Sequence, residues 1–331
     1  MISRQKPDAA LLGTLFSAQG QRISLHDLAQ ASGIPSAELE TRLAPYREAG
    51  YPVLSYPQGG IGLLDPPDIW CAEEILGRCP VPDTAAGLVW DPLLLTETAS
   101  TNDVVREQAR KGARAGFLVA ASRQTRGRGR LGRIWESPPN QGLYVSILLR
   151  PDWPCVEAGK LTILSSVAAV DAVEAIAGFR PQIKWPNDLV AHGKKLAGIL
   201  IETEPNGSRL AFAVVGLGIN VSQQTGDFPP ELRSLATSLR LATGHSFRRA
   251  DVLVATLHAL QKRLDRPFAE AREAWAASSL TLGQRVVLTT SRGRRHGQAL
   301  GLDESGALLL RTDTGEVEAV TSGDMEGQPA S

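Results

Sequence analysis

Apolar positions at helical spacing open the chain. Leu11, Leu12, Leu15 and Phe16 form one face of a helix predicted over 9–18. Two further helices are predicted over 25–31 and 37–49, and each follows an N-cap serine and ends at a glycine: Ser24, Gly33, Ser36 and Gly50. Short apolar runs around a glycine-rich turn, at 51–56 and 61–64, then predict a hairpin. This order of elements is the outline of a winged helix-turn-helix.

Proline-bearing breaks interrupt the pattern at 65–67, 79–82 and 91–92. Such a cluster is typical of a connecting segment. We therefore expect a first domain over 1–66 and a linker over 67–92.

Strands and helices alternate from residue 93 onward. Apolar runs predict strands at 93–95, 117–122, 142–150, 183–185, 195–203 and 210–220. Helices are expected at 103–111, 157–177, about 230–240, 248–264 and 267–278. After Gly283, four short apolar segments separated by Gly, Ser or Asp predict a small β-barrel. We therefore expect an α+β protein, with a mixed α/β domain over 93–280 and a β domain over 281–331.

Composition narrows the class of protein. The chain has 331 residues, 43% apolar and 21% charged, which is ordinary for a soluble protein and argues against disorder. Its formal net charge is zero, so nucleic-acid or membrane binding has to rest on local patches. The three cysteines lack a CxxC motif, and neither a signal peptide nor an apolar run of membrane-spanning length is visible. We expect a cytoplasmic protein with reduced thiols and no membrane contact.

The segment 122–135, SRQTRGRGRLGRIW, holds five arginines and no acidic residue. It follows a predicted strand, and Gly127 to Gly132 match GxGxxG. A dinucleotide-binding fold needs a helix to open at the third glycine, and Pro138 and Pro139 prevent one. A glycine-rich, arginine-rich loop can instead close over a polyanion. A solvated basic loop is the alternative that composition leaves open.

Four other segments place polar groups beside strands, and two of them form one predicted hairpin. In 184–188 (KWPND) and 194–202 (KKLAGILIE), a predicted hairpin lets Lys184, Asp188 and Lys195 face one cleft. In 216–220 (GLGIN), small residues let a flat ligand or another backbone come close. In 100–102 (STN), side chains suit a neutral polar ligand. A solvated turn, tight strand packing and a helix N-cap are the respective structural alternatives.

Three other common catalytic motifs are absent from the sequence. The chain has no GxxxxGK[ST], HExxH or GxSxG motif, and its five histidines are scattered, so no built-in zinc site is expected.

Together, the STN, Arg/Gly, KWPND, KLAG and GLGIN motifs, in this order and spacing, resemble the biotin protein ligases. With the N-terminal helices, the chain resembles those members that are also biotin operon repressors. The resemblance implies a central biotin/lipoate ligase domain of the class II synthetase type and a C-terminal SH3-like barrel. It also implies a reaction in which biotin and Mg-ATP give biotinyl-adenylate, and biotin then passes to a lysine of the biotin carboxyl carrier protein of acetyl-CoA carboxylase. Operator DNA and a second copy of the chain are further implied partners.

The resemblance also implies roles for individual residues. The biotin head would be held by Ser100, Thr101, Asn102 and Gln124. The loop residues Arg128, Gly129 and Arg130 would cover biotin and the phosphates. Lys195 would bridge the biotin carboxyl and the α-phosphate, where charge develops. Asp188 would orient the acceptor amine or take its proton. The nucleotide side would be formed by Arg130, Arg133, Trp135, Lys184, Asn187 and Asn220. No metal site is expected beyond the Mg²⁺ that accompanies ATP.

Two regions depart from the family pattern. In the predicted recognition helix only Arg42 and Arg47 are basic, Glu38 and Glu40 lie near its start, and Pro45 lies inside it. DNA binding depends on phosphate neutralisation, so a DNA-binding domain and a structural relic both remain open. The tail 322–331 has no Lys or Arg to reach the phosphates, which leaves as candidate substitutes Arg292, Arg294 and Arg295.

Two other functions remain as alternatives. A lipoate-type ligase would share the fold, but the Arg/Gly loop argues against it. A non-catalytic biotin-sensing transcription factor would not need Asp188 or Lys195.

Overall fold

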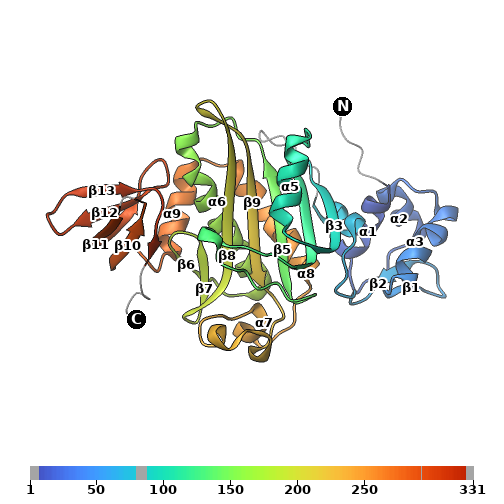
Figure 1. Ribbon diagram of the computed structural model, residues 1–331. Helices are drawn as coiled ribbons and strands as arrows, with labels where there is room; N and C mark the ends of the chain where they lie inside the picture. The colour runs from blue at the N-terminus through green and yellow to red at the C-terminus, as the bar shows by residue number, and fades with distance from the viewer. Residues whose placement is uncertain (1–6, 80–87, 292, 326–331) are drawn as a thin grey trace.

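The computed structural model describes residues 7–79, 88–291 and 293–325. Three units follow one another along the chain. The N-terminal helices and the C-terminal strands lie on opposite sides of the large central domain (Figure 1). Within the described residues, no helix has the length and apolar character needed to cross a lipid bilayer.

The N-terminal unit has the predicted order of elements. Its helices are α1 (Pro7–Ser17), α2 (Leu25–Ser32) and α3 (Leu39–Glu48), and its hairpin pairs β1 (Val53–Ser55) with β2 (Ile61–Leu63). Ser24 caps α2 as predicted, because its side chain accepts the Asp27 N–H at 3.0 Å, and Gly33 ends that helix with a φ of 71°. The predicted Ser36 cap is wrong. Ser36 begins a 3₁₀ turn that delays the α-helix to Leu39.

The predicted linker contains a helix, α4 (Ala72–Arg78), although its residues 80–87 lie outside the described part of the chain. Helix α4 packs closely on α1, since a Cβ atom at Gly13 would lie 2.3 Å from the Gly77 carbonyl oxygen. The buried carboxylate of Glu74 accepts from Tyr51 at 2.6 Å and from Arg248 of the central domain at 2.9 Å. The connecting segment therefore contacts both the N-terminal unit and the central domain.

A seven-stranded mixed sheet forms the central domain. Its strand order is β3-β4-β5-β9-β8-β7-β6, with β3 parallel to β4 and the other neighbours antiparallel. The strands are β3 (Asp91–Thr98), β4 (Phe117–Gln124), β5 (Gly142–Leu149), β6 (Gln182–Lys184), β7 (Asp188–Ala191), β8 (Lys194–Asn206) and β9 (Arg209–Asn220). The predicted strands are thus confirmed, with ends moved by a few residues.

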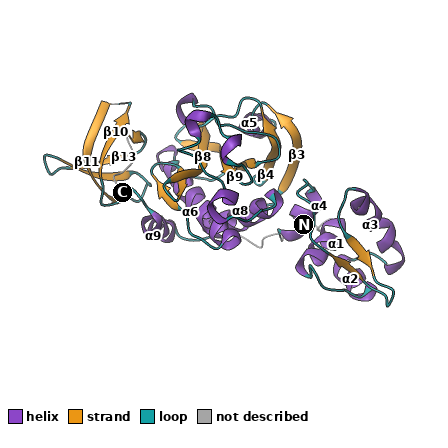
Figure 2. Ribbon diagram, turned by 90° about the horizontal axis from the view of Figure 1, so that it is seen from below, coloured by secondary structure: helices purple, strands orange, loops and turns teal. Residues whose placement is uncertain are grey.

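Helices cover both faces of this sheet. Helices α6 (Gly159–Ala177) and α8 (Arg249–Leu264) lie on one face and α5 (Thr101–Arg110) on the other (Figure 2). Successive residues of a strand point to opposite faces, so Val119 and Val214 pack in the cluster under α5, whereas Leu118 and Val215 belong to the larger core. Helix α9 (Phe268–Ser278) packs beside α6.

One predicted helix, at about 230–240, is wrong. The chain there forms a 3₁₀ turn (Pro230–Leu232) and enters helix α7 (Leu239–Thr243) only later. Between them, the Leu235 carbonyl accepts the Lys195 N–H at 2.8 Å, and the Thr237 N–H donates to the Lys195 carbonyl at 2.9 Å. These bonds to β8 use the backbone groups that a continuous helix would need.

The C-terminal unit is a five-stranded antiparallel sheet in the order β13-β12-β11-β10-β14. Its strands are β10 (Arg285–Thr290), β11 (Gly293–Leu302), β12 (Leu308–Thr312), β13 (Val317–Val320) and β14 (Asp324–Met325). The four predicted strands are confirmed. The short β14 was not predicted, and it brings Asp324 to the central domain.

Candidate active site

A cavity of about 370 Å³ lies over the sheet between the Arg/Gly loop and the β6–β7–β8 strands. Every residue for which a ligand-side role was predicted lines it: Ser100, Thr101, Asn102, Gln124, Arg128, Gly129, Arg130, Arg133, Trp135, Lys184, Asn187, Asp188, Lys195 and Asn220. These predicted residues, up to 120 positions apart in sequence, therefore meet at one place.

The floor of the cavity is polar and buried. Thr101 is 3% exposed and Asn102 is 4% exposed. Ser100 precedes α5, but its side chain does not cap the helix. The Thr101 N–H instead donates to Gln124 Oε1 at 2.9 Å, so a residue of β4 satisfies the helix start. The N-cap alternative for the STN motif is therefore wrong for the Ser100 side chain.

The Arg/Gly loop forms a small closed turn and not a helix start. Arg128 and Ile134 form an isolated antiparallel β-bridge, and the Gly129 N–H donates to the Arg133 carbonyl at 2.8 Å. At its tip, Leu131 has a φ of 55° and Gly132 a φ of 73°. No α-helix follows Gly132 in the described loop, which agrees with rejecting a dinucleotide fold.

Trp135 lies against glycines of the sheet. A Cβ atom at Gly218 would lie 2.4 Å from the indole ring, and one at Gly198 would lie 3.1 Å from it. Gly216 likewise leaves room for the Asn102 side chain, since a Cβ atom added at Gly216 would lie 2.4 Å from Asn102 Oδ1. The small residues of the GLGIN motif thus admit side chains that line the cavity. Asn220 is held in place because its amide donates to the Thr237 carbonyl at 2.9 Å.

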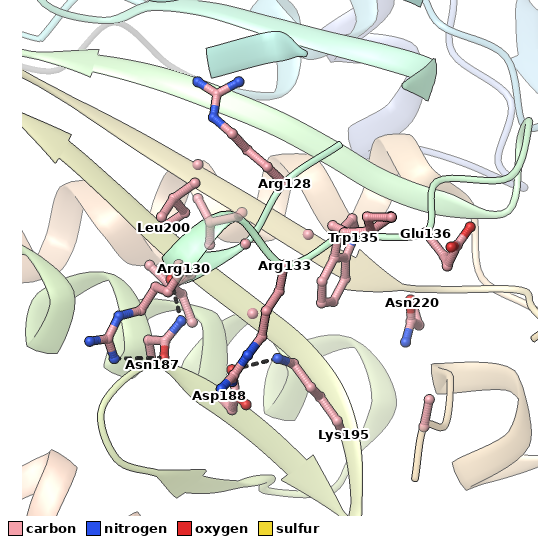
Figure 3. Close-up of a pocket in the computed structure, with 18 of the residues that line it drawn as sticks. Arg128, Arg130, Arg133, Trp135, Glu136, Asn187, Asp188, Lys195, Leu200 and Asn220 are labelled. Atoms are coloured by element: carbon pink, nitrogen blue, oxygen red, sulfur yellow. Dashed lines mark hydrogen bonds and ion pairs between the residues drawn. The ribbon is translucent and has the colours of Figure 1, made fainter. Parts of the chain in front are cut away.

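Charged groups gather at the other end of the cavity. Lys195 Nζ lies 2.7 Å from Asp188 Oδ1 and 5.4 Å from the Trp135 ring centroid (Figure 3). Arg130 donates to Asn187 Oδ1 at 3.4 Å. Burial lowers the pKa of Arg130, and the carboxylates of Asp324 and Asp188 oppose that shift. The hairpin thus brings Lys184, Asp188 and Lys195 to one cavity, as the KWPND and KLAG motifs predicted, and Arg130 reaches the same end from the Arg/Gly loop.

Arg128 extends away from Arg130 and Arg133 (Figure 3). Its guanidinium donates to both oxygens of Asp103, at 2.7 and 2.9 Å, and to Glu202. The hydrogen bond from Arg128 holds the pKa of Asp103 below its usual range. In this arrangement Arg128 anchors the base of the loop to α5 and β8, whereas the prediction placed it over the ligand.

Two acidic residues that contact side chains of the site were not singled out from the sequence. Arg133 donates to Asp324 of β14. The segment that begins at residue 322 therefore brings a carboxylate to the site, where the family pattern would have a basic side chain. Arg294 and Arg295 lie on β11 and are not among the cavity-lining residues, and Arg292 lies outside the described residues. Glu202 ends the KKLAGILIE segment and contacts both Asn102 and Arg128. Only its position, on the same strand β8 as Lys195, could have indicated it.

The two basic residues of the predicted recognition helix are engaged within the N-terminal unit. Arg42 lies 3.5 Å from Asp8. Arg47 donates to the Val53 carbonyl at 2.8 Å, to Glu40 at 2.6 Å and to Ser55 at 2.9 Å, which ties α3 to the hairpin.

Comparison with known proteins agrees with this geometry. The family model described as "Biotin/lipoate A/B protein ligase family" matches residues 94–220, and "Biotin protein ligase C terminal domain" matches residues 281–326. The chain is 35% identical over 317 residues to "Bifunctional ligase/repressor BirA" of Bacillus subtilis, covering 94% of this chain and 96% of that protein. The chain belongs to the biotin protein ligase family.

This ligase also resembles a solved structure. The biotin protein ligase from Aquifex aeolicus in complex with biotin and ATP aligns with a TM-score of 0.61 at 31% identity, covering 71% of this chain and 97% of that one. The "Biotin--[acetyl-CoA-carboxylase] ligase" of Paracoccus denitrificans is 33% identical and covers 67% of this ligase and 95% of that protein.

Proposed function

We propose that this ligase activates biotin with Mg-ATP and transfers it to a lysine of a biotin carboxyl carrier protein. The observation that carries the proposal is the division of the cavity. Its floor is buried, neutral and hydrogen-bonding, and its other end holds Lys195, Asp188, Arg130 and Arg133. Such a cavity suits a molecule with a neutral polar head and a carboxylate that reacts beside a triphosphate.

The first step makes a poor acyl donor reactive. A carboxylate oxygen of biotin attacks the α-phosphorus of ATP, and pyrophosphate leaves. Lys195 would stabilise the charge that develops between the two groups, while Arg130, Arg133 and Lys184 would bind phosphate oxygens. Asn187, Trp135 and Asn220 would line the nucleotide side, and Mg²⁺ would arrive with ATP.

The second step transfers the acyl group. The neutral amine of the acceptor lysine attacks the acyl carbon, AMP leaves, and the amine loses a proton. Asp188 would orient that amine or take its proton once Lys195 has turned to the adenylate. The acceptor would be the carrier protein of acetyl-CoA carboxylase, as the name of the Paracoccus relative indicates for that enzyme. We place the reaction in the cytoplasm.

Pyrophosphate release tests the proposal. Purified protein with ATP and Mg²⁺ should release pyrophosphate with biotin and far less with lipoate, and it should biotinylate the purified carrier domain. Faster release with lipoate would favour a lipoate-type ligase. Biotin binding without release would favour a non-catalytic sensor.

We further propose domains over 1–66, 93–280 and 281–331, with the connection at 67–92 joining the first to the second. The first would be a winged helix-turn-helix, the second a class II synthetase-like ligase domain and the third an SH3-like barrel. The order of N-terminal elements and the full-length similarity to a ligase/repressor support a second function as biotin operon repressor.

The repressor function would require a homodimer on operator DNA, with Arg42 and Arg47 as candidate DNA contacts. Native mass spectrometry should show a monomer-to-dimer shift with biotin and Mg-ATP, and fluorescence anisotropy should show binding to DNA upstream of the biotin genes. Retained adenylate without either change would leave a ligase whose N-terminal unit is structural.

A further inference from the structure

Glu202 lies on β8 outside the cavity wall, and the roles proposed above leave it unused. Three side chains converge on its carboxylate. Asn102 Nδ2 donates at 2.6 Å, Arg106 Nη2 lies at 2.6 Å, and Arg128 Nη2 lies at 3.1 and 3.2 Å from the two oxygens. Because two guanidiniums neutralise its charge, the site tolerates a carboxylate that is only 24% exposed.

This carboxylate determines how the Asn102 amide is turned. An ionised carboxylate only accepts hydrogen bonds, so Asn102 must present its NH₂ group to Glu202 and its Oδ1 to Ser146. Gly216 provides the space for Oδ1, since a Cβ atom there would lie 2.4 Å from it. The orientation therefore follows from chemistry and from the shape of the sheet.

The direction continues into the floor of the cavity. Asn102 Oδ1 only accepts, so the Ser146 hydroxyl must donate to it. Ser146 has one proton, and the Thr101 hydroxyl, 2.7 Å away, must therefore donate to Ser146. Thr101, Asn102 and Ser146 are at most 4% exposed, so bulk water does not offer alternative partners.

The floor of the cavity therefore presents hydrogen-bond acceptors to a ligand. Thr101 Oγ1 lies within hydrogen-bonding distance of both Ser146 Oγ, at 2.7 Å, and Gln124 Oε1, at 3.1 Å. Because Ser146 gives its proton to Asn102, the single Thr101 hydroxyl proton goes to the nearer Ser146 oxygen. Gln124 Oε1 accepts the Thr101 backbone N–H at 2.9 Å and keeps its second lone pair. The NH₂ group of Gln124 donates to Ser137 Oγ at 3.2 Å. Both oxygens therefore keep lone pairs for a ligand, and an N–H donor placed against them would relieve their mutual repulsion. The ureido ring of biotin carries two such N–H groups.

We propose that Glu202 is a positioning residue that sets the direction of the hydrogen bonds in the pocket floor, so that the floor accepts from the ureido N–H groups of biotin. The identity of the ligand rests on the proposed function. Glu202 acts through Asn102, Ser146 and Thr101 and does not touch the ligand itself.

Calorimetric titration of the full-length protein with biotin tests this role without requiring turnover. Glu202→Gln offers an amide that can also donate, so Asn102 can turn over and the floor loses its single direction. We expect the Kd for biotin to rise about ten-fold, the loss of roughly one charge-assisted hydrogen bond, and the Kd for ATP to stay within about two-fold. Glu204→Gln is the matched control, because Glu204 lies on the same face of β8 and pairs with Arg110 of the same helix at 2.8 Å.

A paired exchange distinguishes direction from simple packing. Asn102→Asp alone sets two carboxylates against each other and should weaken biotin binding. Combined with Glu202→Gln, the new amide at position 202 donates to the new carboxylate at position 102, which again accepts from Ser146. The double variant should bind biotin more tightly than either single variant.

The outcomes separate this proposal from the proposed function. Wild-type biotin affinity in Glu202→Gln, equal losses of biotin and ATP affinity, or a double variant weaker than both single variants would each overturn the role of Glu202. If wild-type protein binds biotin and the variants behave as expected, but no pyrophosphate is released, the ligase proposal fails and the Glu202 proposal stands. If wild-type protein does not bind biotin, both fail. If Glu202→Gln is insoluble, the comparison of Asn102→Asp with the double variant decides.

Discussion

The cavity and the N-terminal unit both contain cationic side chains beside carboxylates, but they arrange them differently. Around the cavity, Arg130 and Lys195 come from separate segments and converge on one volume of about 370 Å³. In the N-terminal unit, Arg42 and Arg47 contact acidic groups of the same unit, and Arg47 also holds a backbone carbonyl. Cationic side chains therefore indicate a ligand site where they converge on a cavity. Where their contacts lie within their own unit, as for Arg42 and Arg47, they indicate structural support.

The largest effect is expected from Lys195. Lys195→Ala removes the cation that would stabilise charge between the biotin carboxyl and the α-phosphate, and it should slow pyrophosphate release about 100-fold or more. Lys194→Ala is the control, because Lys194 is the exposed neighbour on the same strand. Equal activity of the two variants would remove Lys195 from the chemistry and weaken the contrast between the regions.

Asp188 tests whether acyl transfer and adenylate formation depend on different residues of the cavity. Asp188→Asn keeps the shape but removes the charge that faces Lys195 at 2.7 Å. We expect transfer from preformed biotinyl-adenylate to the carrier domain to slow about 100-fold in a single-turnover experiment, with a smaller effect on adenylate formation. Normal transfer would exclude Asp188 as the base.

Gly218 tests whether the wall depends on close packing. In Gly218→Ala the new methyl group would lie 2.4 Å from the Trp135 ring, so the indole must move. We expect ATP binding to weaken roughly ten-fold, in line with the usual cost of overpacking. Gly226→Ala serves as the control, because nothing lies within 4 Å of its added Cβ. Unchanged ATP affinity in Gly218→Ala would show that Trp135 does not form the nucleotide side.

Arg47 tests the other region. Arg47→Ala removes two hydrogen bonds from α3 to the hairpin, to Val53 and Ser55, and the ion pair with Glu40 within α3. It should destabilise the N-terminal unit by about 1–3 kcal/mol, while pyrophosphate release stays unchanged. Hydrogen exchange at 53–63 measures the effect. Arg42→Ala should leave that exchange unchanged, since the ion pair of Arg42 with Asp8 is long, at 3.5 Å, and partly exposed. Loss of DNA binding in Arg42→Ala with a normal fold would assign a DNA contact to this region after all.

The smallest effect concerns Asp103 at the base of the loop. Arg128 lowers the pKa of this carboxyl in the folded state, so its contribution to stability is complete above the ordinary value of 3.8 and is lost as the pH falls through the lower folded-state pKa. Asp103→Asn should therefore lower the urea midpoint at pH 7, and the difference from wild type should shrink at the acid end. A difference that is independent of pH would contradict the ion pair.

Periodicity predicted most elements because they bury one regular face. The strands and helices that contribute to the central core, such as β5 and α6, were expected close to their observed ends. The failures had two causes, since a distant strand competes for the backbone at 230–240 and a local 3₁₀ turn forms at 36–38. The segment 230–240 gives backbone bonds to Lys195, and Pro35 leads into a 3₁₀ turn where an N-cap was expected at Ser36.

The motifs predicted the site better than the individual roles. Each residue to which the five motifs gave a ligand-side role lines the cavity, because these short motifs already limited the choice of residues. The partners were not predictable, since Arg128 meets Asp103 and Glu202, and Arg133 meets Asp324 across 191 positions of the chain. A sequence shows which groups can carry charge, but not which opposite charge lies beside each of them.

The sequence by itself determined the order of most elements, the polar motifs that surround the cavity and the small number of basic residues in the predicted recognition helix, because these follow from residue types and local spacing. Only the tertiary structure decided the direction of hydrogen bonds from Thr101 to Glu202, the position of Trp135 over two glycines and the commitment of Arg47 to the hairpin. These features depend on distances of a few ångströms between strands and helices that are far apart in the chain, and hydrogen bonds act only over such distances.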